Sequence, residues 1–187
     1  MSVDVTISQT QLITGEALAA MGDVGRCELV AGKIVKMSPT GYEHGNIEIK
    51  VGARLYNFVS ERKLGKVQVG EVGIYTRRNP DTVRAADVLF ISNERYAQRQ
   101  SPSYLDVAPE LVVEIISPDD RWSEINQKLR EYFAAGIDLI WVIDPKSRSV
   151  HVYRSLTDIR EFSADETLSG EEILPGLSIS INELFDD

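Results

Sequence analysis

Apolar residues follow a helical period in the stretch from Glu43 to Gly65. They are spaced by four, four, three and one residues, which places all of them on one face of an α-helix. These positions are Ile47, Val51, Leu55, Phe58 and Val59. The pattern predicts an amphipathic helix over 43–64 that packs one face against a core.

Extended runs with turn residues between them predict strands. Two short runs over 27–30 and 33–37 are joined by Ala31 and Gly32, which is typical of a tight hairpin, and a second hairpin is expected from 138–144 and 149–153. Further strands are predicted over 66–76, from Asp87 onward, and over 111–116. In the first of these, alternation places one set of residues on the same side: Val67, Val69, Glu71, Gly73 and Tyr75.

Two more helices flank the predicted strands. One covers 14–21, and the other follows the turn at Ser117-Pro118-Asp119-Asp120 and runs to Ala135, with Gly136 as its C-cap. Residues 92–110 form a polar connection that is long enough to act as a mobile flap. Mixed strands and helices indicate an α/β chain with a mixed central sheet flanked by helices and an N-terminal β-hairpin.

The composition is that of a globular protein. The chain has 187 residues, of which 43% are apolar and 26% charged, so residues 1–187 are expected to form a single domain. No apolar run approaches the roughly 18 to 20 residues of a membrane helix, and Met1–Thr10 lacks the features of a signal peptide. Cys27 is the single cysteine and is interpreted as a small core residue. We therefore expect a cytoplasmic protein that makes no membrane contact.

The negative charge of the chain is concentrated at its end. Residues 155–187 contain nine acidic residues and one basic residue (net charge −8), whereas residues 1–154 contain 20 acidic and 19 basic residues (net charge −1). The overall net charge of −9 argues against a nucleic-acid partner, because phosphate binding draws on Lys and Arg. Since the body is balanced, a local basic surface remains compatible with the sequence, and the acidic segment is expected to pack on the domain or to pair subunits.

Two carboxylates interrupt strands that otherwise read as buried. Glu114 lies within the apolar run 111–116, and Asp87 begins another. A buried carboxylate costs several kcal/mol unless a cation or hydrogen bonds compensate it. If the two strands are antiparallel neighbours, both acids reach the same end of the sheet, where they could hold Mg²⁺ or Mn²⁺ together with the carbonyl of Ile115. The alternative is that each acid is an independent strand-end residue.

Three further polar residues are candidates for the same site. Lys128 lies at the rim of the apolar stripe of its helix, where it could direct its ammonium at the carboxylates or simply extend to solvent. His44 precedes Ile47 by one turn and could orient a phosphate or shuttle a proton, although a lone histidine near a helix start is more often an ordinary hydrogen-bonded residue. Glu28 is a third acid in an apolar strand, and its alternative role is a salt bridge with Arg26 or Arg84.

The order of these segments resembles the Uma-two family of restriction-endonuclease-like proteins, a branch of the PD-(D/E)xK nuclease superfamily. The likeness covers nearly the whole chain. The segments that carry it are Cys27–Val35, His44 at a helix start, Ala86-Asp87-Val88, Pro109–Pro118, Lys128 with Tyr132 and Ala135-Gly136, Trp141–Pro145, and Leu174–Leu177.

The resemblance implies a restriction-endonuclease-like core in which Asp87 and Glu114 hold a divalent metal. The superfamily pattern places a lysine two residues after the glutamate, but Ile116 stands there, and Lys128 on the next helix is the matching residue. The proline that usually precedes the aspartate is replaced by Ala86. Activity therefore depends on whether the ammonium of Lys128 reaches the carboxylates.

We therefore expect a Mg²⁺-dependent endonuclease, with Mn²⁺ as a substitute, that acts on DNA in preference to RNA, most simply as a homodimer. Asp87, Glu114 and Lys128 would carry the reaction, with Glu28 and His44 completing the pocket. Two alternatives stay open, namely a catalytically silent domain that binds nucleic acid or protein, and a hydrolase of small phosphoesters. The sequence contains no nucleophilic triad, phosphate-binding glycine loop or zinc-ligand spacing, so those classes of chemistry are poorly supported.

Overall fold

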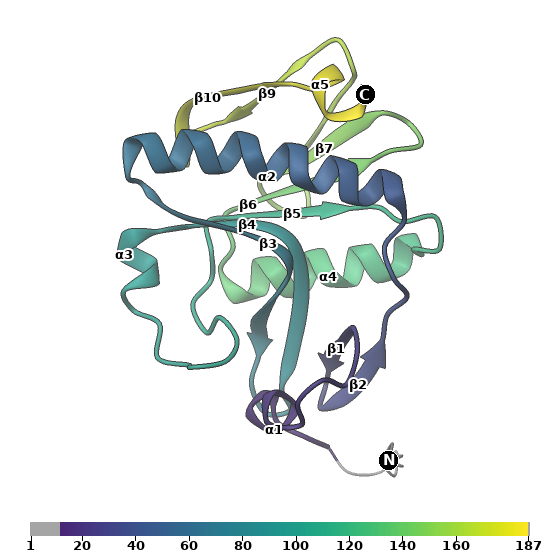
Figure 1. The fold of residues 1–187 in the computed structure, drawn as a ribbon, viewed down its shortest axis with the longest axis vertical. Helices are drawn as coiled ribbons and strands as arrows, with labels where there is room; N and C mark the ends of the chain where they lie inside the picture. The colour runs from purple at the N-terminus through teal and green to yellow at the C-terminus, as the bar shows by residue number, and fades with distance from the viewer. Residues whose placement is uncertain (1–11, 187) are drawn as a thin grey trace.

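A mixed eight-stranded sheet runs through the part of the chain that the computed structural model describes, residues 12–186 (Figure 1). Seven strands follow the order β2-β1-β4-β5-β6-β7-β8, and β3 pairs with β4 as a branch. Strands β5 and β6 are parallel, and the other pairs of this sheet are antiparallel. The strands are β1 (Cys27–Val30), β2 (Lys33–Lys36), β3 (Gly65–Arg77), β4 (Thr82–Ser92), β5 (Leu111–Ile115), β6 (Leu139–Asp144), β7 (Ser149–Tyr153) and β8 (Ile159–Phe162).

Helices cover both faces of this sheet. Helix α2 (Tyr42–Arg62) lies on one face, together with a small second sheet of β9 (Thr167–Gly170) and β10 (Leu174–Ser180) and the short α5 (Asn182–Phe185), and α4 (Trp122–Ala135) lies on the other face (Figure 1). Helix α1 (Gly15–Ala20) packs near the β1–β2 hairpin, and α3 (Asn93–Tyr96) follows β4. The predicted mixed α/β architecture with an N-terminal hairpin is confirmed. No helix among the described residues is long and apolar enough to cross a membrane.

The amphipathic helix predicted from periodicity is α2. Its buried residues include Ile47, Val51, Leu55 and Val59, which pack against the inward side chains of the central strands, whereas Phe58 is half-buried. The helix ends where Lys63 takes the left-handed conformation (φ 55°). Helix α4 ends similarly at Gly136 (φ 97°), as its predicted C-cap role requires.

Strand β4 begins five residues earlier than predicted. Its residues from Thr82 to Ile91 are all buried, so the two-residue alternation that marks a half-exposed strand is absent. Arg84 obscures the pattern further because it is a charged residue that is only 7% exposed. The predicted antiparallel pairing of this strand with β5 is present, with Val88 opposite Val113.

A bulge interrupts the pairing of β3 with β4 within the strand predicted over residues 66–76. Gly70 and Glu71 both have positive φ (88° and 61°), and the register with β4 shifts between Val69 and Val72. Val67, before the bulge, packs with the core under α2, and Ile74, after it, packs with the core under α4.

Short elements in the polar segments were missed by sequence reasoning. The predicted connection over 92–110 contains α3, and its buried Leu105 forms a parallel bridge with Ile74. The acidic segment contains β8, β9, β10 and α5, and it contributes seven buried residues to the core beside α2: Phe162, Leu168, Leu174, Leu177, Ile179, Ile181 and Leu184. Cys27 is a free thiol that is only partly buried, in contrast to its predicted core position. The residues Met1–Thr10 lie outside the described part of the chain.

Candidate active site

Asp87 and Glu114 lie beside each other where the β4–β5 ladder ends. The last register pair in this direction is Val88 with Val113, so the next residue on each strand is one of the two acids. Asp87 Oδ2 accepts a hydrogen bond from the backbone amide of Ile115 at 2.7 Å, which fixes the carboxylate across the end of the ladder. The structure therefore brings the two predicted acids to the same end of the sheet.

Glu114 is held by two side chains from α4. Lys128 Nζ donates to one carboxylate oxygen at 2.9 Å, and Tyr132 Oη donates to the other at 2.6 Å. Burial raises the pKa of Glu114 to about 7, with the charge of Asp87 adding to the rise and Lys128 and Tyr132 opposing it. Glu114 can therefore exchange a proton near neutral pH.

Lys128 points into the molecule from the rim of the buried stripe of α4. Its ammonium contacts Glu114, lies 3.1 Å from Glu28 Oε1 and donates to the Ala85 carbonyl at 3.3 Å. Burial alone would lower the pKa of Lys128. The negative charges of Glu114 and Glu28 outweigh this effect, so the pKa of Lys128 lies above its usual value. The lysine is therefore charged at neutral pH, although its side chain is only 20% exposed.

Glu28 reaches this cluster from β1. Its carboxylate binds Arg84 Nη1 at 2.6 Å and accepts the Ala85 amide at 3.0 Å, and Arg84 also pairs with Glu131 of α4. Burial opposes ionisation of Glu28, but Lys128 and Arg84 prevail and its pKa is lowered. The predicted Arg84 salt bridge and the predicted contribution to the site therefore occur together at Glu28.

His44 lies on the opposite side of Asp87 from this cluster of α4 side chains. His44 Nε2 is 3.3 Å from Asp87 Oδ2, and Nδ1 is 3.9 Å from Glu48 Oε2, one turn later on α2. Burial alone would lower the pKa of His44. The hydrogen bond to Asp87 and the charge of Asp87 outweigh this effect, so the pKa of His44 lies above its usual value. His44 is thus brought to Asp87, as expected, whereas Glu48 was not foreseen.

The chemistry of these donors fits a hard divalent cation. Asp87 and Glu114 supply carboxylate oxygens from adjacent strands, and Ile115 lies next to Glu114 on β5. Oxygen ligands of this kind are those that Mg²⁺ and Mn²⁺ prefer. The role of the Ile115 carbonyl as a metal ligand stays a prediction, since the contact of Ile115 at this site is through its amide.

Besides Glu48, Arg84 and Tyr132 contact the predicted residues but were not assigned to the site from the sequence. Tyr132 has no exposed surface and was placed among the apolar positions of α4, because a tyrosine at a buried helical position reads as core. Arg84 was named only as an alternative salt-bridge partner of Glu28, since a cation buried in a strand requires an acidic partner.

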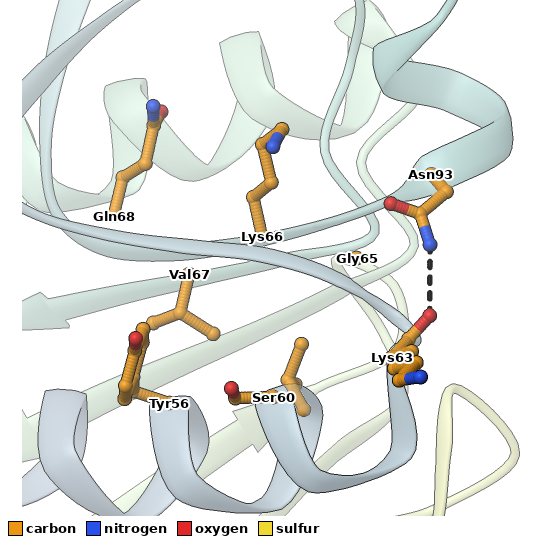
Figure 2. Close-up of a pocket in the computed structure, with 9 residues that line it drawn as sticks. Tyr56, Ser60, Lys63, Gly65, Lys66, Val67, Gln68 and Asn93 are labelled. Atoms are coloured by element: carbon orange, nitrogen blue, oxygen red, sulfur yellow. Dashed lines mark hydrogen bonds between the residues drawn. The ribbon is translucent and has the colours of Figure 1, made fainter.

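A pocket of about 500 Å³ lies away from these acids, between the end of α2 and the start of β3 (Figure 2). The pocket lies beside Gly65, which pairs with Ser92 of β4. Ser92 is five residues from Asp87, or roughly 17 Å along the strand at 3.4 Å per residue, so the pocket is distant from the acids. Figure 2 shows Lys66 and Gln68 pointing to the other side of β3 from Val67. Because its polar side chains do not converge, the pocket offers no comparable site.

A family model described as "Putative restriction endonuclease" matches residues 16–182. The chain belongs to the Uma2 family. Among solved structures, a chain described as a "putative nuclease belonging to DUF820" from Anabaena variabilis shares the fold of this Uma2 protein, with a TM-score of 0.72 and 21% identity over 85% of this chain and 89% of that chain. A comparison with curated proteins found no match. The predicted family and nuclease-like fold are confirmed.

Proposed function

We propose that this Uma2 protein is a Mg²⁺-dependent endonuclease that hydrolyses phosphodiester bonds in DNA, with Mn²⁺ as a substitute. The observation that carries the proposal is the contact of Lys128 with Glu114 beside Asp87. Two acids and one lysine at the end of adjacent strands are the group that the family resemblance implies, and here the lysine comes from α4.

Asp87 and Glu114 would hold the metal, with the Ile115 carbonyl as a further ligand. A bound Mg²⁺ polarises a scissile phosphate and lowers the pKa of an attacking water. The Ile115 amide keeps Asp87 directed across the strand ends, and Tyr132 keeps one oxygen of Glu114 directed toward α4. The residues of the site are thus held in place before substrate binds, which is how electrostatic catalysis reaches its full effect.

Lys128 would stabilise the negative charge that develops on the phosphate or orient the attacking water. Its ammonium carries a full charge at neutral pH and is flanked by Glu28 and Glu114, so it is positioned without needing the substrate. Glu28 acts on the reaction through Lys128 and is therefore a positioning residue. His44 would orient Asp87 or take up a proton beside it.

We also propose a compartment and an oligomeric state for the protein. The single cysteine is a free thiol, which favours the reducing cytoplasm. Helix α2 exposes apolar residues at seven-residue intervals, which favours a homodimer. These residues are Tyr42, Ile49 and Tyr56, which are 88%, 60% and 59% exposed. Light scattering of the purified protein measures the oligomeric state directly, and a monomer at micromolar concentration would contradict this part of the proposal.

A catalytically silent binding domain is the second candidate, and the net charge of −9 favours it. Incubation of supercoiled plasmid with the protein in Mg²⁺ or Mn²⁺ separates the two, with Glu114→Gln and chelator as controls. We expect metal-dependent nicking or linearisation that both controls abolish. Retained DNA binding with no cleavage in either metal would replace the enzyme by a binding domain, and turnover of a small phosphoester without plasmid cleavage would indicate the phosphoesterase instead.

A further inference from the structure

An exposed tryptophan stands at the start of α4. Trp122 is the first residue of the helix and is 51% exposed, whereas Trp141, the other tryptophan of the chain, is completely buried. The indole of Trp122 lies against the imidazole of His151 on β7, with 6.4 Å between the ring centroids and 59° between the ring planes. The histidine therefore supports the indole on one side, and about half of Trp122 stays open to solvent.

Strand register places His151 in line with Glu114 of the candidate active site. Glu114 of β5 pairs with Val142 of β6, and Val142 pairs with His151 of β7. Paired residues of neighbouring strands share one face of the sheet, and here it is the α4 face, where Val142 belongs to the core. Two strand spacings of about 4.8 Å place His151 roughly 10 Å from Glu114.

A similar separation is found along α4. Lys128 follows Trp122 by six residues, or roughly 9 Å along the helix axis at 1.5 Å per residue. Stacked nucleotides advance about 3.4 Å each along a strand. A nucleic acid with one phosphate at the carboxylates therefore has a base in reach of Trp122 within about three nucleotides.

Two exposed cations lie at the same end of the sheet. Arg121 directly precedes the tryptophan, and Lys146 lies in the turn between β6 and β7. The ends of β5 and β6 are neighbours, since the Ile116 amide donates to the Ile143 carbonyl. Cations for the phosphates and an aromatic ring for the bases are the combination by which proteins bind single-stranded nucleic acid.

Acidic residues in the same segment favour contact with a base over contact with a long stretch of backbone. Asp119, Asp120 and Glu124 flank the exposed ring and would repel the closely spaced phosphates of a duplex. Stacking needs no such neutralisation, because every base has a π-face. In a duplex those faces are covered by neighbouring base pairs, so the indole can stack only on an unpaired base.

We propose that Trp122 stacks on an unpaired base of the substrate, and that the substrate is DNA with a single-stranded segment close to the scissile phosphate. His151 supports the indole, and Arg121 and Lys146 contact neighbouring phosphates. The inference rests on the proposed endonuclease function and narrows its substrate class. It involves none of the residues that would hold the metal.

Tryptophan fluorescence tests the stacking, because Trp122 is exposed whereas Trp141 is buried. Single-stranded oligo-dT is titrated into the protein with chelator present, so that binding is measured without metal-dependent cleavage. We expect stacking to quench the emission of the parent. Trp122→Phe should lose the quenching and keep most of the affinity. Quenching that persists in Trp122→Phe would come from Trp141 and would overturn the proposal.

Anisotropy of a labelled oligo-dT separates stacking from simple apolar contact. Trp122→Leu keeps a large apolar side chain and removes the π-face, so affinity should fall about 5- to 150-fold, as expected for the loss of one stacked base. Ile159→Ala on β8 is the control, because Ile159 is 48% exposed, and it should bind like the parent. The corresponding duplex should bind with an affinity that does not depend on Trp122. Thermal unfolding checks that each variant folds.

These outcomes are distinguishable from failure of the nuclease assay. If Trp122→Leu binds the single strand as tightly as the parent, or if the parent does not bind it, the stacking site does not exist, whatever the plasmid assay shows. A change of mass in light scattering with unchanged affinity would make Trp122 a contact between copies of the chain and would also overturn the proposal. If affinity depends on Trp122 but the parent cleaves nothing in Mg²⁺ or Mn²⁺, the stacking site stands and the proposed endonuclease function fails.

Discussion

Lys128 lies between two carboxylates, 2.9 Å from Glu114 and 3.1 Å from Glu28, which come from different strands. In the pattern that the family resemblance implies, the lysine shares a strand with the glutamate, but Ile116 occupies that position here. Two carboxylate contacts offset the side-chain entropy that is lost when a long lysine side chain is held in one position. Glu28 provides the second contact, and Tyr132 binds the other oxygen of Glu114.

Metal binding at Asp87 and Glu114 should depend on pH through Glu114. Because its pKa is raised to about 7, Mg²⁺ has to displace a proton below that pH, so affinity should rise up to about pH 7 and level off above it. Calorimetry at pH 6 in two buffers of different ionisation enthalpy should report close to one proton released per ion. Affinity that does not change between pH 5.5 and 8 would contradict the assignment of Glu114.

The same shift affects stability without metal. A carboxyl group with a raised pKa in the folded state binds its proton more tightly there than in the unfolded chain, so its contribution to stability is present below about pH 4.5 and is lost as pH rises through about 7. Glu114→Gln should therefore flatten the decline of the free energy of unfolding between pH 5 and 8. Urea unfolding measures this slope, and Glu161→Gln on the surface should leave it as in the parent.

Lys128→Met should reduce plasmid cleavage in Mg²⁺ by about two orders of magnitude or more, because it removes one preorganised charge and keeps the apolar stem. Metal binding should persist, but it should shift to higher pH, since Lys128 lowers the pKa of Glu114. Single-turnover rates and metal titrations on the same preparation measure both effects. A Met variant as active as the parent would favour the silent binding domain.

Tyr132→Phe should move the pH dependence of cleavage to higher pH. The phenol hydroxyl donates to Glu114 and lowers its pKa, so its removal raises that pKa. The expected result is a rate that is reduced at pH 6.5 and largely recovered at pH 8.5. Tyr153→Phe makes the same change at another buried tyrosine, on β7, and serves as the control whose pH profile should match the parent. A parallel loss at every pH would mean that Tyr132 has only a packing role.

We propose that residues 155–187 are an integral part of one domain. Leu184 of α5 has no exposed surface and packs in the core beside α2, so Leu184→Ala should lower the free energy of unfolding by about 2–5 kcal/mol. Leu156, in the same segment, is 41% exposed, and Leu156→Ala should cost far less. Equal effects of the two substitutions in urea unfolding would show that the segment is an appendage.

Periodicity predicted the elements whose two faces differ in environment. Helix α2 has one buried and one exposed face, so its apolar spacing was sufficient. Strand β4 is buried along nearly its whole length, and therefore its beginning at Thr82 could not be found from alternation. The bulge at Gly70 and Glu71 could not be predicted for a different reason. Valines precede and follow it in the sequence, as in a regular strand, and only the register with β4 reveals the extra residue.

The part of the site that could be predicted from the sequence is the need of each buried carboxylate for a cation or hydrogen-bond donor. Burial of Asp87, Glu114 and Glu28 within apolar runs implied cations nearby, and Lys128 and Arg84 now stand beside Glu28. Which cation meets which acid depends on the packing of α4 against β1 and β4, and no local pattern carries that information. Glu48 was missed because an acid on the surface stripe of a helix reads as solvated.

The β1–β2 hairpin carries Glu28 and joins the main sheet along a short edge. Its register with β4 is the pair Leu29 with Val83. The Gly32 amide also donates to the Asp81 carbonyl, and Glu28 contacts Arg84 and the Ala85 amide. Detachment of the hairpin would leave β4, β5 and α4 in place, yet it would release Lys128 from one of its two anchors. The Ala85 amide is covered by Glu28, so its rate of hydrogen exchange records how often the lysine loses that support.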